Sequence, residues 1–331
     1  MNSFWAAGEI ISLIILTSKG IYHFRQLKFK ITHLLLLLSF FCVVILNAYY
    51  GSAESLKVIL VVLYVFLVYN FPKFAIKVFI LIYTSVIASN IFILGEFSKA
   101  NQYDFIVIFT LFLISKDKLN LSKGVILSYF VLIVFELMQS FYFSSRSNLL
   151  FLFMLLFGLF SSNIVRSNTC RFLPYIPAVY IGVMYFYYVS AFTYNLPITL
   201  SNVERSSMIA WCIENFTNYI FIGPGDSIFI EGAKNMMFAG LSRDTPNDPH
   251  SVFLRLFVSL GAIVSSLIFA LFFKITRKFR VIFKSPVLMV IYINMIIVLT
   301  LGTFTADTRV LIGLFTGVLM CYSNVLNEKD V

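Results

Sequence analysis

The chain has 331 residues, of which 60% are hydrophobic and 12% are charged, and its formal net charge at pH 7 is +10. A soluble domain of this length cannot bury so much apolar surface in one core. The composition therefore excludes an ordinary soluble enzyme or binding module and predicts an all-α protein that crosses a bilayer many times. The four cysteines have no short spacing, so neither a metal knuckle nor a redox pair is indicated.

Apolar stretches of about 20 residues, the length that crosses a bilayer as a helix, recur along the chain. We expect about eleven such helices, with ten and twelve as alternatives, at 4–22, 31–50, 56–71, 75–95, 103–115, 124–143, 147–163, 172–194, 251–273, 285–303 and 308–325. The first stretch contains Glu9 and Lys19 and lacks a basic leader. We therefore expect it to stay in the membrane and not to be a cleavable signal peptide.

Most of the Lys and Arg residues fall in alternate, short gaps between these helices. Examples are Lys73, Arg171 and Lys278. The other set of gaps is longer and contains fewer cations, such as Arg309, together with acidic residues. Because positively charged loops are retained in the cytoplasm, the amino terminus is predicted to be periplasmic and the carboxyl terminus cytoplasmic. Topology thus explains the net positive charge, which gives no support to nucleic-acid binding.

Residues 195–250 form one long polar stretch on the predicted external face. Connections between packed helices are usually far shorter, and long ones are either functional or disordered. Within this stretch, 208–222 has the apolar pattern of a helix lying on the membrane surface, with Trp211 and Tyr219 at the level of the headgroups. The Gly-Pro-Gly at 223–225 is typical of a helix stop and a tight turn. We therefore predict a structured periplasmic loop.

Three basic residues at the predicted external boundary are candidates for function. Arg146 begins the seventh helix, where a guanidinium is costly unless it snorkels to the surface or meets an anion. Arg205 lies at the start of the predicted surface helix, and its alternative role is an ion pair with Glu204 or Glu214. His250 ends the loop at the mouth of the next helix, where a solvated ring with no function is the alternative.

The order of several features along the second half of the chain is its most specific signal. The first features are an Arg before a Leu- and Phe-rich span (Arg146) and an Arg followed six residues later by Trp (Arg205 and Trp211). A Gly-x-Gly turn (Gly223 and Gly225) and a His that begins an apolar helix (His250) come next. This order resembles the O-antigen ligase and O-antigen polymerase superfamily. The resemblance begins at Ser145 and departs from the family pattern at Ser251, where members usually carry Asn.

The resemblance implies a metal-independent membrane glycosyltransferase without a cofactor, built as a GT-C-like bundle in the bacterial inner membrane. Residues 1–144 would form amino-terminal membrane helices, and 145–331 would be the catalytic region. The donor it implies is an oligosaccharide on undecaprenyl pyrophosphate, and membrane lipids, a chain-length regulator and a flippase are the further partners it implies. The absence of an Asp-x-Asp pair in the loop agrees with this family, whose members are thought to act without a metal ion.

The same resemblance suggests a role for each candidate residue. Arg146 and Arg205 would hold the pyrophosphate, because arginine binds phosphate oxygens bidentately and stays charged. His250 would accept the proton of the acceptor hydroxyl as general base. Trp211 and the turn at 223–225 would shape the loop. The two arginines and the histidine are expected to converge on one cavity at the external boundary.

Three functions are compatible with these patterns. A polymerase would join the glycan to a second lipid-linked repeat unit, and a ligase would join it to the lipid A core. The Phe-, Ile- and Asn-rich composition favours the polymerase, because it is typical of repeat-unit gene clusters. A flippase or other transporter would need polar residues deep in several helices, where the sequence offers mainly Glu136.

Overall fold

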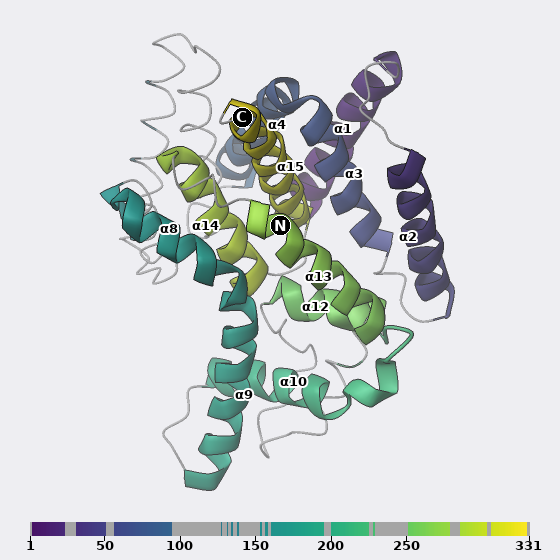
Figure 1. The fold of residues 1–331 in the computed structure, drawn as a ribbon, viewed down its shortest axis with the longest axis vertical. Coiled ribbons are helices and arrows are strands. Elements are labelled where there is room, and N and C mark those ends of the chain that lie inside the picture. Colours follow the sequence, from purple (N-terminus) through teal and green to yellow (C-terminus); the bar gives the residue numbers. More distant parts are fainter. Residues whose placement is uncertain are drawn as a thin grey trace.

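The structure is a computed structural model that describes residues 2–23, 31–50, 56–94, 127, 131, 134, 138, 153, 156–157, 160–194, 200–224, 228, 251–278, 285–302 and 306–329. Every regular element in these residues is an α-helix or a short 3-10 helix (Figure 1). The predicted all-α class is therefore confirmed. The helix expected at 103–115 lies outside the described residues. The helices expected at 124–143 and 147–163 are described mainly at isolated positions, and each of these is helical. Residues 160–163, at the end of the range 147–163, are also described.

The amino-terminal helices match the predicted ranges to within a few residues. They are α1 (Asn2–Tyr22), α2 (Ile31–Tyr50), α3 (Leu56–Asn70) and α4 (Pro72–Leu94). Continuous apolar runs form these helices, and α4 begins at a proline, whose missing N–H is not needed in the first turn. Local sequence is therefore sufficient to specify this part of the fold.

The remaining elements are α8 (Asn163–Phe172), η3 (Leu173–Tyr175), α9 (Ile176–Tyr194), α10 (Leu200–Glu214), η4 (Phe216–Tyr219), α12 (Val252–Leu260), α13 (Ala262–Lys278), α14 (Pro286–Leu301) and α15 (Ala306–Lys329). Helix α14 lies at the centre of the described part, because every residue from Leu288 to Thr300 is buried. It packs against α9, α12 and α15. Figure 1 shows α10 lying across α9, away from the cluster of α1, α3, α4 and α15.

Helices α3 and α15 approach each other closely because α15 has glycines on the facing side. A Cβ added to Gly317 would lie 2.7 Å from the Cβ of Val68, and one added to Gly313 would collide with the side chain of Tyr64. Small residues four positions apart let two apolar helices pack backbone to backbone, which gains dispersion energy where no hydrophobic effect operates. The last helix of the chain is thus fixed against the amino-terminal part.

The single helix predicted at 251–273 is wrong, because the chain breaks at Gly261. This glycine has φ of +76°, a conformation that disfavours any residue with a Cβ. Helix α12 folds back on α13, so that the ring of Phe269 stacks on Phe253 with centroids 3.5 Å apart and on Phe257 at 5.0 Å. The predicted span is therefore divided into the 9-residue α12 and the 17-residue α13, and the orientation predicted from charge requires that α13 alone cross the membrane.

The surface helix predicted at 208–222 also differs from the structure. Helix α10 begins at Leu200 and ends at Glu214, and the five consecutive residues 206–210 are all buried. A helix that lies on a surface buries only one face. Helix α10 instead packs against Tyr180, Ile181 and Met184, near the middle of the predicted span 172–194. Its alanine, serine and sulfur-containing residues make it small enough to be enclosed.

Among the described residues, one continuous helical stretch is long and apolar enough to cross a membrane, namely Asn163–Ala191. The other apolar helices found by the same criteria are shorter, such as Leu56–Asn70 and Pro286–Leu301. The predicted number of membrane crossings therefore remains a prediction.

Candidate functional site

Arg205 lies in the second turn of α10 and is partly buried. Its Nε atom is inaccessible to solvent and has no hydrogen-bond partner among the described residues. The guanidinium lies within electrostatic range of Tyr180 on α9. A buried polar donor without a partner costs free energy, most of all when its group is charged. An acceptor for this nitrogen must therefore come from outside the described residues.

Within the described residues, Arg205 forms no ion pair with Glu214, the structural role considered from the sequence. Nine residues separate the two, which places them on opposite faces of a helix and about 13.5 Å apart along its axis. Glu214 is exposed at the end of α10. Helix geometry thus removes one of the two structural explanations, and the side chain of Glu204 lies outside the described residues.

Trp211 is the second donor on α10 that lacks a partner among the described residues. Its indole Nε1 is buried, and its ring packs against the cluster that joins α10 to its neighbours. We expected this ring at the headgroup level of a surface helix. The structure shows the ring partly buried against the hydrophobic cluster that α10 shares with α12 and α9.

The helices inside the long loop and the helix that follows it share one hydrophobic cluster. It joins α10 and η4 to α12, through Met208, Ile209, Cys212, Tyr219, Leu254 and Val258. The cluster therefore brings the helix of Arg205 beside the helix that begins two residues after His250. His250 itself, Arg146 and Gly225 lie outside the described residues. The predicted convergence of Arg146, Arg205 and His250 remains a prediction.

A hydrogen bond closes the end of α10. The Tyr219 hydroxyl donates to the backbone carbonyl of Cys212 at the last turn of the helix, where carbonyls lack helical partners. Burial raises the pKa of the Tyr219 phenol, so it remains a neutral donor over the physiological pH range. The 3-10 turn is thereby fixed against α10, and the next residues enter the Gly-x-Gly turn in a defined direction.

Gly223 allows this turn to contact the end of α12 directly. A Cβ added to Gly223 would collide with the Val258 carbonyl, and one added to Gly261 would lie 2.9 Å from the backbone of Phe221. The Gly223 N–H donates to Oδ1 of Asn47 on α2 at 3.0 Å, and the Ile263 N–H donates to the Ile220 carbonyl at 3.1 Å. Gly223 thus has a structural role, since it lets two backbones meet.

Ser251, which directly follows His250 in the chain, has a structural role. Ser251 is fully buried and caps α12, since its hydroxyl accepts a hydrogen bond from the Leu254 N–H at 3.3 Å. Ser and Asn are both among the residues preferred at this helix position. The serine can therefore do the capping that an asparagine would do, directly after His250. The next residue, Val252, packs near α14: a Cβ added to Gly302 would lie 3.3 Å from the Val252 side chain.

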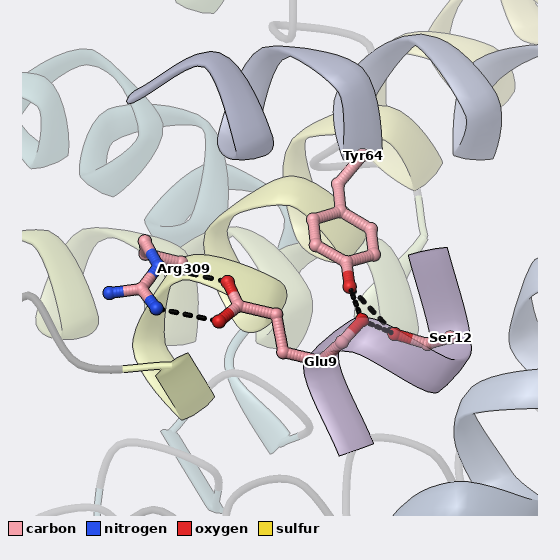
Figure 2. Close-up of polar contacts among 4 residues, drawn as sticks. All are labelled: Glu9, Ser12, Tyr64 and Arg309. Atoms are coloured by element: carbon pink, nitrogen blue, oxygen red, sulfur yellow. Dashed lines mark hydrogen bonds and ion pairs between the residues drawn. The ribbon is translucent and has the colours of Figure 1, made fainter. Parts of the chain in front are cut away.

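A polar cluster not anticipated from the sequence joins the first helix to the last (Figure 2). Glu9 on α1 and Arg309 on α15 are both buried and form a bidentate ion pair, with Nε–Oε1 at 2.8 Å and a second nitrogen at 2.6 Å from Oε2. Beside it, the Tyr64 hydroxyl of α3 donates to the Glu9 carbonyl at 2.5 Å and lies 2.6 Å from Ser12 Oγ. Three helices are thus tied together.

The sequence held one signal for this cluster. Glu9 is the single carboxylate of the first apolar stretch, and Arg309 stands near the start of the last one. A charge inside an apolar helix almost always pairs with another charge. The sequence alone, however, does not indicate that Glu9 and Arg309 are partners, because they lie 300 residues apart.

The chain matches no family model, no curated protein and no solved structure.

Proposed function

We propose that the chain is a membrane glycosyltransferase of the O-antigen polymerase type, with its site at the periplasmic face of the bacterial inner membrane. One observation carries this proposal. Arg205 has a buried guanidinium nitrogen without a partner among the described residues, on a helix that shares a hydrophobic cluster with the helix directly following His250. The helix of Arg205 and the helix that follows His250 in the chain are thus neighbours in space.

The proposed chemistry uses no nucleotide, because the donor already carries a good leaving group. The acceptor hydroxyl attacks the anomeric carbon of the donor glycan, and His250 takes the hydroxyl proton. The bond from that carbon to the pyrophosphate oxygen breaks, and its electron pair leaves with undecaprenyl pyrophosphate. Arg205 and Arg146 stabilise the negative charge that develops on the leaving oxygens. A single displacement of this kind inverts the anomeric centre.

The proposal includes about ten to twelve membrane crossings, and exposed apolar side chains support the membrane location. Ile14 and Ile21 on α1, Leu46 on α2 and Val183 on α9 are each more than half exposed. Soluble proteins rarely leave contiguous apolar surface of this kind in water. Lipid chains are the solvent in which these faces would be stable.

A transporter is the second candidate, and the Glu9–Arg309 pair is the observation that favours it. Buried charges in membrane helices often mark ion or substrate pathways. In this pair, however, both carboxylate oxygens contact guanidinium nitrogens. A closed bidentate pair of this kind is better suited to holding helices together than to binding a transported ion.

The glycan pattern of cells that carry the His250→Ala form tests the proposal. If the chain is a polymerase, these cells display lipid A core capped with a single repeat unit, since a separate ligase still transfers that unit. If it is a ligase, they accumulate long polymer on the polyprenyl carrier and display bare core. The control is Lys77→Ala, an exposed residue on α4 that should leave the glycan pattern unchanged. A normal ladder of chain lengths with His250→Ala would refute both enzymatic functions.

A further inference from the structure

A cavity of about 360 Å³ opens between the α8–η3 segment and the end of α13, away from α10 and the proposed catalytic site. Its walls include Arg171, Phe172, Tyr175, Phe273 and Thr276. The rings of Tyr175 and Phe273 stack at 5.5 Å with 28° between their planes, which joins the two sides of the cavity. The proposed glycosyl transfer uses none of these residues.

Arg171 is the charged group among the described residues that line this cavity. Of the uncharged polar side chains there, the Thr276 hydroxyl donates to the Phe273 carbonyl at 3.0 Å and the Cys170 thiol donates to Met289 Sδ at 3.3 Å, while Tyr175 adds a neutral hydroxyl. Arg171 is exposed and forms no ion pair with any described residue. The described lining residues include no carboxylate. The cavity therefore offers a positive charge and no counter-charge.

An apolar stripe leads away from the cavity along one face of η3 and α9. Its side chains recur every three or four residues, and each is between 52% and 71% exposed, namely Phe172, Tyr175, Val179, Val183 and Phe186. This face belongs to Asn163–Ala191, the stretch with the length and composition of a membrane span. A ligand that fits both features has an anionic head and a long apolar tail.

We propose that this cavity binds the headgroup of an anionic phospholipid, with Arg171 on the phosphate diester and the acyl chains along the stripe. Basic pockets between helices at the cytoplasmic boundary are suited to such headgroups. The predicted orientation places this cavity there, since Arg171 and Lys274 both belong to the cytoplasmic set of cations. A zwitterionic lipid fits less well, because its ammonium group would meet no carboxylate. The proposal rests on the proposed membrane location but not on the proposed glycosyl transfer.

The test measures which lipids stay bound to the purified full-length protein. The protein is reconstituted in vesicles of equimolar phosphatidylglycerol and phosphatidylcholine, re-extracted in mild detergent and analysed by native mass spectrometry. The wild type should retain phosphatidylglycerol preferentially. Arg171→Ala and Arg171→Gln should reduce this preference about tenfold, which corresponds to about 1.4 kcal/mol, whereas Arg171→Lys should keep part of it. Lys77→Ala removes an exposed cation elsewhere and should change nothing.

Three results would overturn the proposal. The first is that the wild type retains the two lipids equally, and the second is that Arg171→Ala and Arg171→Gln both keep the wild-type preference. The third is that excess inorganic phosphate displaces phosphatidylglycerol, which would indicate a site for free phosphate. Arg171 is exposed, so its replacement should not prevent folding. The measurement contains no glycan donor, so its failure is distinct from failure of the proposed transfer, which the His250→Ala glycan pattern reports separately.

Discussion

At the scale of single residues, the structure has two kinds of buried arginine. Two nitrogens of Arg309 donate to the Glu9 carboxylate, whereas the partly buried Arg205 keeps one buried nitrogen without a partner in the described part of the chain. Removing one partner of a buried pair is strongly destabilising, whereas an unsatisfied buried donor requires an explanation such as a bound group. We therefore propose a structural role for the first residue and substrate binding for the second, and each proposal has a different experimental consequence.

We expect Glu9→Gln to destabilise the protein, because it leaves the Arg309 charge buried without a counter-charge. Breaking a buried pair in this way typically costs about 3–5 kcal/mol. Thermal unfolding in detergent, followed by circular dichroism, measures the effect, and the double exchange Glu9→Arg with Arg309→Glu should recover part of the loss. Ser18→Ala, an exposed position on the same helix, is the control. Unfolding of Glu9→Gln at the wild-type temperature would contradict this role.

At the scale of elements, the contact between the 220–223 turn and the α12–α13 hairpin shapes the region of the candidate site. It depends on two glycines, one with positive φ at the hairpin and one facing the α12 backbone. The Asn47 side chain on α2 adds a hydrogen bond from a third element. The loop that contains Arg205 is thus connected to the helix that follows His250 by backbone contacts as well as by the hydrophobic cluster.

The substitution Gly223→Ala tests that contact, with Gly182→Ala as its matched control. A methyl group at Gly223 would collide with the Val258 carbonyl, whereas at Gly182 it would meet nothing within 4 Å. Overpacking typically costs about 1–3 kcal/mol, and alanine in an exposed helix interior is more stable than glycine by about 0.5–1 kcal/mol. Compared with the wild type, Gly223→Ala should therefore unfold at a lower temperature and Gly182→Ala at a higher one. Equal unfolding temperatures would show that the turn does not pack on α12 as described.

The sequence predicted some elements well and others poorly, for physical reasons. Helices α1 to α4 follow from continuous apolar runs, since helical hydrogen bonds and local apolarity are enough to define them. The break at Gly261 was missed because the apolar run continues through it, and its positive φ depends on the approach of Phe221, forty residues earlier in the chain. The Glu9–Arg309 pair joins residues 300 apart, which no local pattern specifies.

The candidate site was predictable in part. The apolar pattern predicts a helix at 208–222 that contains Trp211 and has Arg205 near its start, whereas α10 contains both residues. Their enclosure did not, because it depends on α9 and α12 packing around α10. Gly223 was expected only to shape a turn, and its contact with the α12 backbone needed the tertiary structure.

At the scale of the whole molecule, the orientation predicted from charge stays a prediction, and it assigns neighbouring segments to the same face. Segments assigned to the same face by their charge are neighbours: Tyr175, just after one basic gap, stacks on Phe273, just before another. On the opposite face, Gly223 of the external loop bonds to Asn47 near the external end of α2. A reporter fused after Lys278 should therefore be cytoplasmic and one fused near Gly232 should be periplasmic. The reverse result at either point would move the site to the other face.

Glycan transfer by the purified protein tests the central claim most directly. The full chain, reconstituted in lipid vesicles with undecaprenyl-pyrophosphate-linked repeat units as both donor and acceptor, should produce a ladder of longer glycans and release undecaprenyl pyrophosphate. His250→Ala should slow this transfer by about 10²–10⁴, the usual contribution of a general base. Arg205→Ala should slow it at least about tenfold, as expected for a lost charge-assisted hydrogen bond of about 1.5–3 kcal/mol. A ladder formed at the wild-type rate by either variant would contradict the proposed site, and no transfer by an intact wild type would contradict the proposed function.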